Sequence, residues 1–267
     1  MRTARLKLAI PAIYHCTSRI IEDRRILDDS CKDFLLKNLH LWADFCGVEL
    51  LAYCIMDSHY HILARVDPTQ TVNPTELDRR FRLINSHLPR KLEQWERDFK
   101  KKDKNTLISV SSRMGDISLF LKEYKQAITP WINAYHERRG PLWLNRFTSL
   151  VVEDVPEVRQ TVASYIDLNP VRAQLEEKPQ NYKWSTSGQT SSTEHSSILQ
   201  THLSNPESPL LKRIPAFTLG TILGSSRFVN NTSLKIDRPY KLNKRHYTIP
   251  VHGLNPDIFT TYSKPRS

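Results

Sequence analysis

Residues 48–66 have the sequence VELLAYCIMDSHYHILARV and predict two β-strands, 48–56 and 59–66, joined by the tight connection Met56–Ser58. Side chains on a strand alternate between its two faces. The second strand therefore presents His59, His61, Leu63 and Arg65 on one face and a core-forming set on the other, namely Tyr60, Ile62, Ala64 and Val66. Two histidines at i and i+2 on one face could hold a divalent metal ion between them.

The segments before this pair predict a strand over residues 9–17, a polar connection and a helix over 32–46. The apolar residues of that helix, Leu35, Leu39, Trp42 and Cys46, recur at helical spacing, and Gly47 provides its C-terminal stop.

The segments after the pair predict a helical insertion over 67–113 with a basic, solvated surface. A helix over 116–135 follows, which Pro130 should kink or end, and then a strand over 141–152. The next helix begins with Asp154 as its N-cap, Pro156 in the first turn and Glu157 at the third position. It carries Tyr165 and should end near Asn169, before Pro170.

This order of elements predicts an α+β protein with a ferredoxin-like antiparallel sheet and helices on one face. Nine of the thirteen residues from Ser185 to Ser197 are Ser or Thr, which is typical of a flexible linker. Residues 198–267 are expected to form a poorly structured basic extension of unknown role, with one apolar stretch, 214–229, and a basic run, 235–246.

Composition favours a polyanionic partner, because the 267 residues carry a net charge of +11 and nucleic acid is the first candidate. No apolar run reaches the roughly 18 residues of a membrane-spanning helix, and the N-terminus lacks the pattern of a signal peptide. We therefore expect a cytoplasmic protein with no membrane partner. Its four cysteines contain no CxxC pair, so we interpret them as reduced, mostly packing residues, with a zinc site built from them as the alternative.

A candidate catalytic group lies in the run ASYIDLNP, residues 163–170. Tyr165 and Asn169 are four residues apart and share one helix face. If that face packs beside the histidine strand, Asn169 could be a third ligand to a metal held by His59 and His61, and Tyr165 could attack a phosphate that the metal polarises. This donor set suits Mg²⁺ or Mn²⁺, and Zn²⁺ or Co²⁺ as well. The alternatives are that Tyr165 packs in the core and that the histidines are ordinary strand residues.

Arginines interleaved with aromatic residues suggest contact with single-stranded nucleic acid, where rings stack on bases and guanidinium groups meet phosphates. Arg138, Arg139 and Arg146 flank Trp143 and Phe147 in this way, although a solvated turn over a packed tryptophan would have the same pattern. His15, on the first strand, could approach the histidine face and take a catalytic or substrate role, or be an ordinary strand histidine.

Four segments in the same order resemble motifs of the single-tyrosine HUH transposases, a family named for its His-hydrophobic-His strand. Residues 53–63 resemble its histidine strand, and 14–19 (YHCTSR) its first strand. Residues 143–149 (WLNRFTS) resemble its W-x-x-R-F-K-S motif, and 165–173 (YIDLNPVRA) its Y-I-x-L-N-P-V-R-A motif. The resemblance covers about residues 9–185 and is nearest to the REP-associated tyrosine transposases. Asp57 and Ser58 replace the usual Pro-Asn before the first histidine, and Tyr60 is a bulkier middle residue.

The resemblance implies a catalytic domain over residues 1–184, with the insertion at about 67–113, that cuts single-stranded DNA beside a hairpin and rejoins it through a 5′-phosphotyrosine. Tyr165 would be the nucleophile, His59, His61 and Asn169 the ligands of Mg²⁺ or Mn²⁺, and the protein a monomer or homodimer associated with the bacterial nucleoid. The candidate DNA-binding residues are His15, Arg19, Arg138, Arg139, Trp143, Arg146 and Arg172. Two other functions stay open: a domesticated hairpin-binding protein that does not cleave, and a metal-dependent phosphodiesterase without a covalent intermediate.

Overall fold

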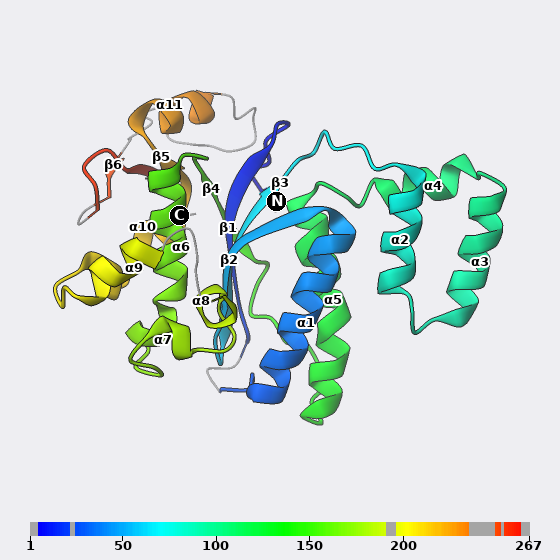
Figure 1. The fold of residues 1–267 in the computed structure, drawn as a ribbon, viewed down its shortest axis with the longest axis horizontal. Coiled ribbons are helices and arrows are strands. Elements are labelled where there is room, and N and C mark those ends of the chain that lie inside the picture. The colour runs from blue at the N-terminus through cyan, green and yellow to red at the C-terminus, as the bar shows by residue number, and fades with distance from the viewer. Residues whose placement is uncertain (1–4, 22–24, 191–195, 235–248, 252–253, 263–267) are drawn as a thin grey trace.

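The computed structural model describes residues 5–21, 25–190, 196–234, 249–251 and 254–262 (Figure 1). Its centre is a mixed seven-stranded sheet with the strand order β2-β3-β1-β4-β5-β7-β6. The strands are β1 (Ala12–Arg19), β2 (Val48–Ile55), β3 (His59–Val66), β4 (Thr148–Val152), β5 (Gly220–Gly224), β6 (Ile249–Pro250) and β7 (Phe259–Tyr262). The helices are α1 (Asp29–Cys46), α2 (Pro74–Ile84), α3 (Pro89–Lys100), α4 (Lys104–Ser111), α5 (Ile117–Tyr135), α6 (Pro156–Asp167), α7 (Asn169–Arg172), α8 (Thr186–Gln189), α9 (Ser196–Leu203), α10 (Pro215–Leu219) and α11 (Ser226–Leu234). None of the described helices has the length and apolar character needed to cross a membrane.

The first four strands are mutually antiparallel where they pair, as the sequence predicted. β1 lies between β3 and β4, and β2 pairs with the outer side of β3. His59 and His61 pair with Arg19 and Thr17 of β1, which places the histidine end of β3 beside the end of β1. Alternation along β3 therefore sends His61 and Leu63 to one face and Tyr60 and Ile62 to the other.

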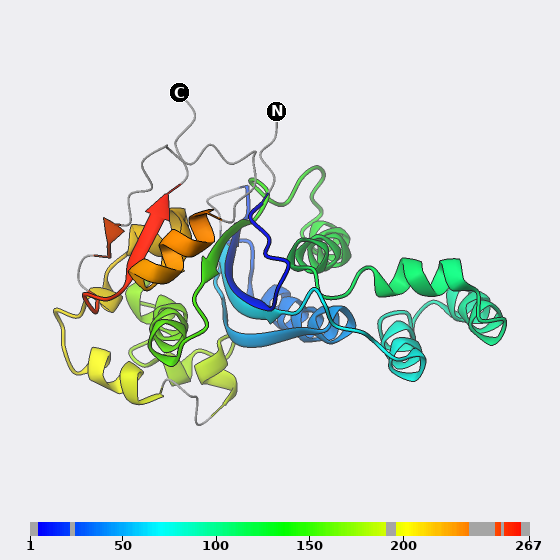
Figure 2. The same ribbon diagram turned by 90° about the horizontal axis from the view of Figure 1, so that it is seen from above.

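Helices cover both faces of the sheet, so the prediction of helices on one face is wrong (Figures 1 and 2). On the first face, α1 and α5 pack on Tyr14, Tyr60 and Ile62. On the second, α6 and the segments after it bury an apolar set that includes Ile13, Leu63 and Leu150. The histidine face is thus enclosed by later parts of the chain, because Leu63 and its apolar neighbours there also require burial.

Local signals explain α1 and its end. Asp28 caps the helix by accepting a hydrogen bond from the Cys31 backbone, and Gly47 ends it in the left-handed conformation at φ 63°. A Cβ atom on Gly47 would also lie within 2.2 Å of the Gln70 side chain. The positive φ favours glycine at this corner, and a larger residue would also require the Gln70 side chain to move.

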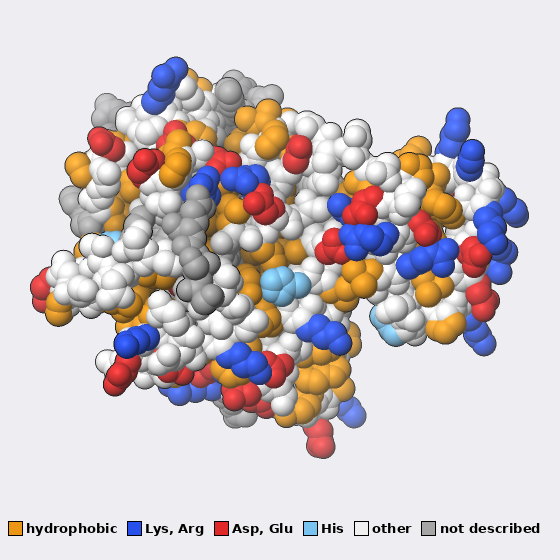
Figure 3. All heavy atoms as spheres, in the orientation of Figure 1, with side chains coloured by type: hydrophobic (Ala, Val, Ile, Leu, Met, Phe, Trp, Pro, Cys, Tyr) orange, Lys and Arg blue, Asp and Glu red, His pale blue; other side chains and the backbone are white. Residues whose placement is uncertain are grey.

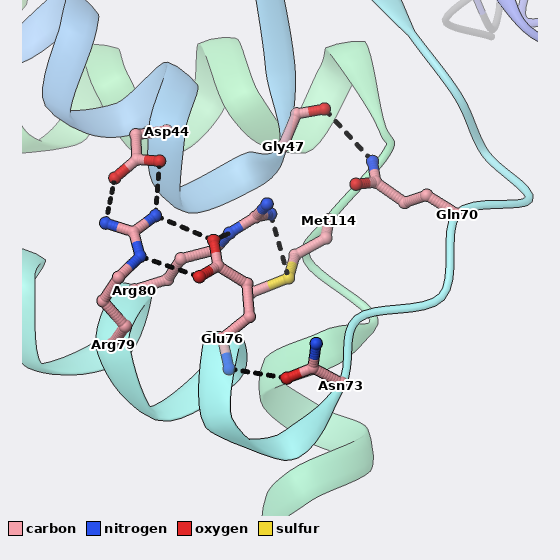
Figure 4. Close-up of polar contacts among 8 residues, drawn as sticks. All are labelled: Asp44, Gly47, Gln70, Asn73, Glu76, Arg79, Arg80 and Met114. Atoms are coloured by element: carbon pink, nitrogen blue, oxygen red, sulfur yellow. Dashed lines mark hydrogen bonds and ion pairs between the residues drawn. The ribbon is translucent and has the colours of Figure 1, made fainter.

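The insertion forms an arm, α2 to α4, that extends away from the sheet (Figures 1 and 2). Figure 4 shows how its base joins α1: Arg79 pairs with both carboxylate oxygens of Asp44 at 2.7 and 2.9 Å, and the Gln70 amide donates to the Gly47 carbonyl. Asn73 caps α2 by accepting from the Glu76 backbone. Lys and Arg side chains gather on the outer part of the arm, with acidic side chains between them (Figure 3).

The C-terminal segment is structured where it is described, contrary to the expectation of a poorly structured extension. β5 adds to the sheet parallel to β4, which makes the sheet mixed, and β7 pairs antiparallel with β5. Phe217, Ile222 and Leu223 are buried against the sheet and its helices. Apolar burial therefore fixes this segment in place, whereas the basic run at 235–246 lies outside the described residues.

The first part of the expected linker is also packed. Ser185 forms a bridge with Cys54 of β2, and the Thr186 hydroxyl accepts from the Tyr53 backbone at 2.7 Å. These contacts cover the outer edge of β2, which would otherwise expose unpaired backbone groups. Residues 191–195 of the expected linker lie outside the described residues.

Three boundaries differ from the prediction. β4 begins at Thr148, and residues 141–147 form a loop held by an isolated bridge from Trp143 to Ile20. Val155, which forms no side-chain cap, precedes α6, because the Asp154 carboxylate pairs instead with Arg65 and Arg159. α5 continues through Pro130 to Tyr135.

Candidate functional site

A cavity of about 560 Å³ opens at the histidine end of β3. Its lining comes from β1, β3, the loop before β4, α6, α7 and the C-terminal segment. His59, His61, Tyr165 and Asn169, which are far apart in the sequence, all line it. One chain therefore brings together the four residues that the sequence proposed as the catalytic set.

Three histidines are adjacent beneath this cavity. His15 Nε2 and His61 Nδ1 are 2.9 Å apart and share a hydrogen bond within the buried interior. The rings of His59 and His61 lie edge to face with centroids 5.2 Å apart, and His59 Nδ1 is 3.2 Å from the Ser58 hydroxyl. His59 and His61, the two histidines that line the cavity, each form a hydrogen bond through Nδ1. The Nε2 atom of each has no hydrogen bond to any described residue.

Burial keeps these imidazoles neutral. It lowers the pKa of His15 to about 3 and that of His59 to about 4, with Arg19 and Arg172 adding to the shift at His59. Burial also lowers the pKa of His61 well below its ordinary value, and the neighbouring histidines add to that effect. Neutral imidazole is the form that binds metal ions.

Tyr165 lies beside the histidines, at the inner side of α6. Its ring is edge to face with His61 at a centroid distance of 6.2 Å and packs on Phe217 at 4.5 Å. The Arg172 guanidinium lies 3.9 Å from the centre of the Tyr165 ring and donates to the Tyr165 carbonyl at 2.7 Å. The tyrosine is thereby held on two sides while it borders the cavity.

Asn169, the first residue of α7, lines the same cavity. Its amide nitrogen donates to the Ile166 carbonyl at 2.9 Å and to the Tyr165 carbonyl at 3.4 Å. These bonds orient the side chain so that its oxygen is the atom left for another partner. Two imidazole nitrogens and one amide oxygen therefore form a donor set that fits a divalent cation.

Four arginines line the cavity: Arg19, Arg146, Arg172 and Arg213. The first three were expected from the sequence to contact DNA. Arg138 and Arg139, which were expected with them, follow α5 and do not line the cavity. His15 lies behind His61, outside the lining, so a direct contact with substrate does not follow from its position.

A larger hollow of about 870 Å³ adjoins the first, and Asn145 and Arg146 line both. Trp143 lines this second hollow together with the cationic residues Arg5, Lys122 and Lys125. Lys125 bridges toward the first cavity, donating to the Ser18 hydroxyl at 2.8 Å and the Asn145 carbonyl at 3.3 Å. Burial lowers the pKa of Lys125 to about 8.

The turn before His59 is braced by α1. The buried Lys32 ammonium donates to the Asp57 carboxylate at 3.0 Å and lies 3.9 Å from the centre of the Trp184 ring. The Leu27 backbone donates to the Asp57 carbonyl, also at 3.0 Å. Asp57, which departs from the family pattern, is therefore tied to the framework that sets the start of β3.

Sequence reasoning missed Arg213, Phe217 and Lys125. The first two belong to a segment that has no recognisable motif. Contacts with distant residues bring it to the site, since Arg172 donates to the Leu210 carbonyl and Phe217 packs on Tyr165. Lys125 lies on a helix whose apolar pattern predicted packing, and nothing in its spacing indicates that it would lie between two cavities. Only tertiary contacts reveal these three positions.

Residues 10–102 match the family described as "Transposase IS200 like". The match spans β1 to α3 and includes His59 and His61 but ends before Tyr165. This part of the chain is therefore similar to IS200-like transposases, the class that the sequence motifs indicated. No curated protein matches the chain.

Among solved structures, a REP-associated tyrosine transposase bound to a REP hairpin is similar with a TM-score of 0.47 and 13% identity, over 80% of this chain and 92% of that one. A putative transposase from Deinococcus radiodurans R1 is similar with a TM-score of 0.29 and 18% identity, over 66% of this chain and 92% of that one.

Proposed function

We propose that this protein is a metal-dependent single-stranded DNA endonuclease and strand transferase that acts beside DNA hairpins, with Tyr165 as its nucleophile. The observation that supports this most directly is the single cavity shared by Tyr165, His59, His61 and Asn169. The IS200-like domain over residues 10–102 supports the transposase class. The net charge of +11 and the arginines of the cavity suit a DNA backbone.

In this proposal His59, His61 and Asn169 hold Mg²⁺ or Mn²⁺, which when bound withdraws charge from a phosphate oxygen. The Tyr165 oxygen attacks phosphorus and forms a phosphotyrosine bond, while the bond from phosphorus to the 3′ oxygen breaks. The phenol proton passes to water, and the leaving oxygen takes up a proton to become a free 3′-OH. Attack of a 3′-OH on the phosphotyrosine reverses these steps and joins the strand.

The surrounding side chains position the reactants. Arg172 and Phe217 hold the Tyr165 ring, so that less orientational freedom is lost when it attacks. Arg19, Arg146 and Arg213 supply cations for the phosphates on either side of the cleaved bond. Trp143 and Lys125 extend this surface into the adjoining hollow, which suits a stacked base and its phosphate.

The proposal is tested with a hairpin oligonucleotide from the flank of the gene, labelled at either end, in Mn²⁺ or in chelator. We expect the 5′-labelled fragment to be released with a free 3′-OH that a polymerase extends, and the 3′-labelled fragment to remain on the protein. Release of both fragments would instead indicate a phosphodiesterase. Hairpin binding without any cut would indicate a DNA-binding protein that has lost catalysis.

A further inference from the structure

A second group of metal-binding side chains lies outside the cavity, between α1 and α5. Asp28, Cys31 and His136 each offer one ligand atom, and these atoms all lie within 4.8 Å of one another. Cys31 Sγ and His136 Nε2 are 3.3 Å apart. The group joins the N-cap of α1 to the C-cap of α5, two helices that lie side by side on the sheet (Figures 1 and 2).

We propose that Asp28, Cys31 and His136 form a zinc site, with water as the fourth ligand. Thiolate, imidazole and carboxylate are the three ligand types that Zn²⁺ takes in proteins. Ligands at zinc distances in a tetrahedron are roughly 3.5 Å apart, close to the 3.3 Å between Cys31 Sγ and His136 Nε2. The Asp28 carboxylate lies within 4.8 Å of both other ligand atoms and provides the third ligand.

The surroundings suit a site that is closed on one side and open on the other. Cys31 is buried in the core, whereas His136 and Asp28 are partly accessible to solvent, so water can supply the fourth ligand. One Asp28 oxygen already accepts from the Cys31 backbone, which leaves the other for the ion. Binding releases the Cys31 thiol proton to solvent, after which one thiolate and one carboxylate balance the two charges of the ion.

A zinc ion at this site would stabilise the helices that support the turn before the histidine strand, β3. Leu27, next to Asp28, donates its backbone N–H to the Asp57 carbonyl in the turn before His59. An ion that locks the start of α1 to the end of α5 therefore restrains one support of that turn. A ligand that binds only the folded chain stabilises it, so zinc is expected to raise the melting temperature.

Cobalt(II) tests the site, because a cysteine thiolate bound to Co²⁺ gives a charge-transfer absorption that histidine and asparagine ligands do not. The full chain with His59→Ala and His61→Ala, which removes the other donor set, is titrated under reducing conditions. We expect the absorption to saturate at one equivalent and to vanish in Cys31→Ser. Cys46→Ser, which alters another buried cysteine of the same helix, should keep it.

His136→Gln provides a variant that leaves the Cys31 core intact, with His40→Gln as its match. Loss of one ligand should weaken Co²⁺ binding about ten-fold or more and remove the rise in melting temperature on adding Zn²⁺, whereas His40→Gln should change neither. Absence of the thiolate absorption, its survival in Cys31→Ser, or equal affinity in His136→Gln would each overturn the proposal. These results are independent of whether the chain cleaves DNA.

Discussion

His15 and His61 share a hydrogen bond, with His15 Nε2 and His61 Nδ1 2.9 Å apart. His15 Nδ1 is buried and forms no hydrogen bond that meets ordinary geometry. Burial lowers the pKa of His15 to about 3, and the neighbouring Phe217 backbone offsets part of that shift. A proton on His15 Nδ1 would face that backbone, and His15 Nε2 would then accept the proton of His61 Nδ1. This tautomer leaves the lone pair of His61 Nε2 directed away from His15 and available for a metal ion.

His15 is therefore expected to position a ligand rather than to touch DNA. His15→Met should weaken Mn²⁺ binding by about 10–100-fold, as is typical when the partner of a metal-binding histidine is removed. His15→Gln, whose amide oxygen can accept the same proton, should lose less. Calorimetric titration measures both, with the exposed His87→Met as control. Equal affinities in the wild type and His15→Met would contradict this role.

The second prediction concerns the number of chains in one site. Tyr165 and His61 meet within a single chain, at a centroid distance of 6.2 Å. A mixture of Tyr165→Phe with a His59→Ala, His61→Ala variant should therefore cleave no hairpin DNA, because each chain lacks half of its own site. Cleavage restored on mixing would show that two chains exchange these residues.

The third prediction concerns the C-terminal segment. Arg213 is exposed at the rim of the cavity, and its loss should remove one phosphate contact. For Arg213→Gln we expect weaker binding of single-stranded DNA. The slope of log K against the logarithm of the salt concentration should become less negative by about 0.7. Arg227→Gln, an exposed arginine of α11 that does not line the cavity, is the matched control. If Arg213→Gln leaves the affinity for DNA and its salt dependence unchanged, the C-terminal segment does not contact DNA through Arg213.

The fourth prediction concerns pH. Burial disfavours a charged ammonium and lowers the pKa of Lys125 to about 8, so this residue is a cation below that pH and neutral above it. Affinity for single-stranded DNA should fall between about pH 7 and pH 9 in the wild type. Lys125→Met should bind more weakly at pH 7 and lack most of that fall. Lys122→Met, an exposed lysine of the same hollow, should keep the fall, and a parallel decline in Lys125→Met would refute the assignment.

The features that the sequence predicted correctly depend on residues close together in the chain. The alternation of residues 59–66, the left-handed stop at Gly47 and the i to i+4 spacing of Tyr165 and Asn169 depend on near neighbours, and each agrees with the structure. The catalytic roles of these residues remain proposals. The match over residues 10–102 agrees with the family that the motifs indicated.

The missed features depend on contacts between distant segments. β5 is short and pairs parallel with β4, far from it in the sequence, so no pattern within residues 198–267 showed that the sheet continues. The sequence predicted Asp154 as a helix cap, but its carboxylate instead accepts a hydrogen bond from Arg65 of β3. Arg138 and Arg139 had a pattern suited to DNA, yet neither of them lines either of the two hollows.

The central claim is that Tyr165 is the nucleophile, and a covalent protein–DNA adduct on a denaturing gel tests it most directly. The wild type, Tyr165→Phe and the exposed Tyr135→Phe are incubated with hairpin oligonucleotides from the gene flanks, with Mn²⁺ or with chelator. We predict an adduct that requires the metal, persists in Tyr135→Phe and disappears in Tyr165→Phe. An adduct that survives in Tyr165→Phe, or metal-dependent cutting with no adduct, would contradict the claim.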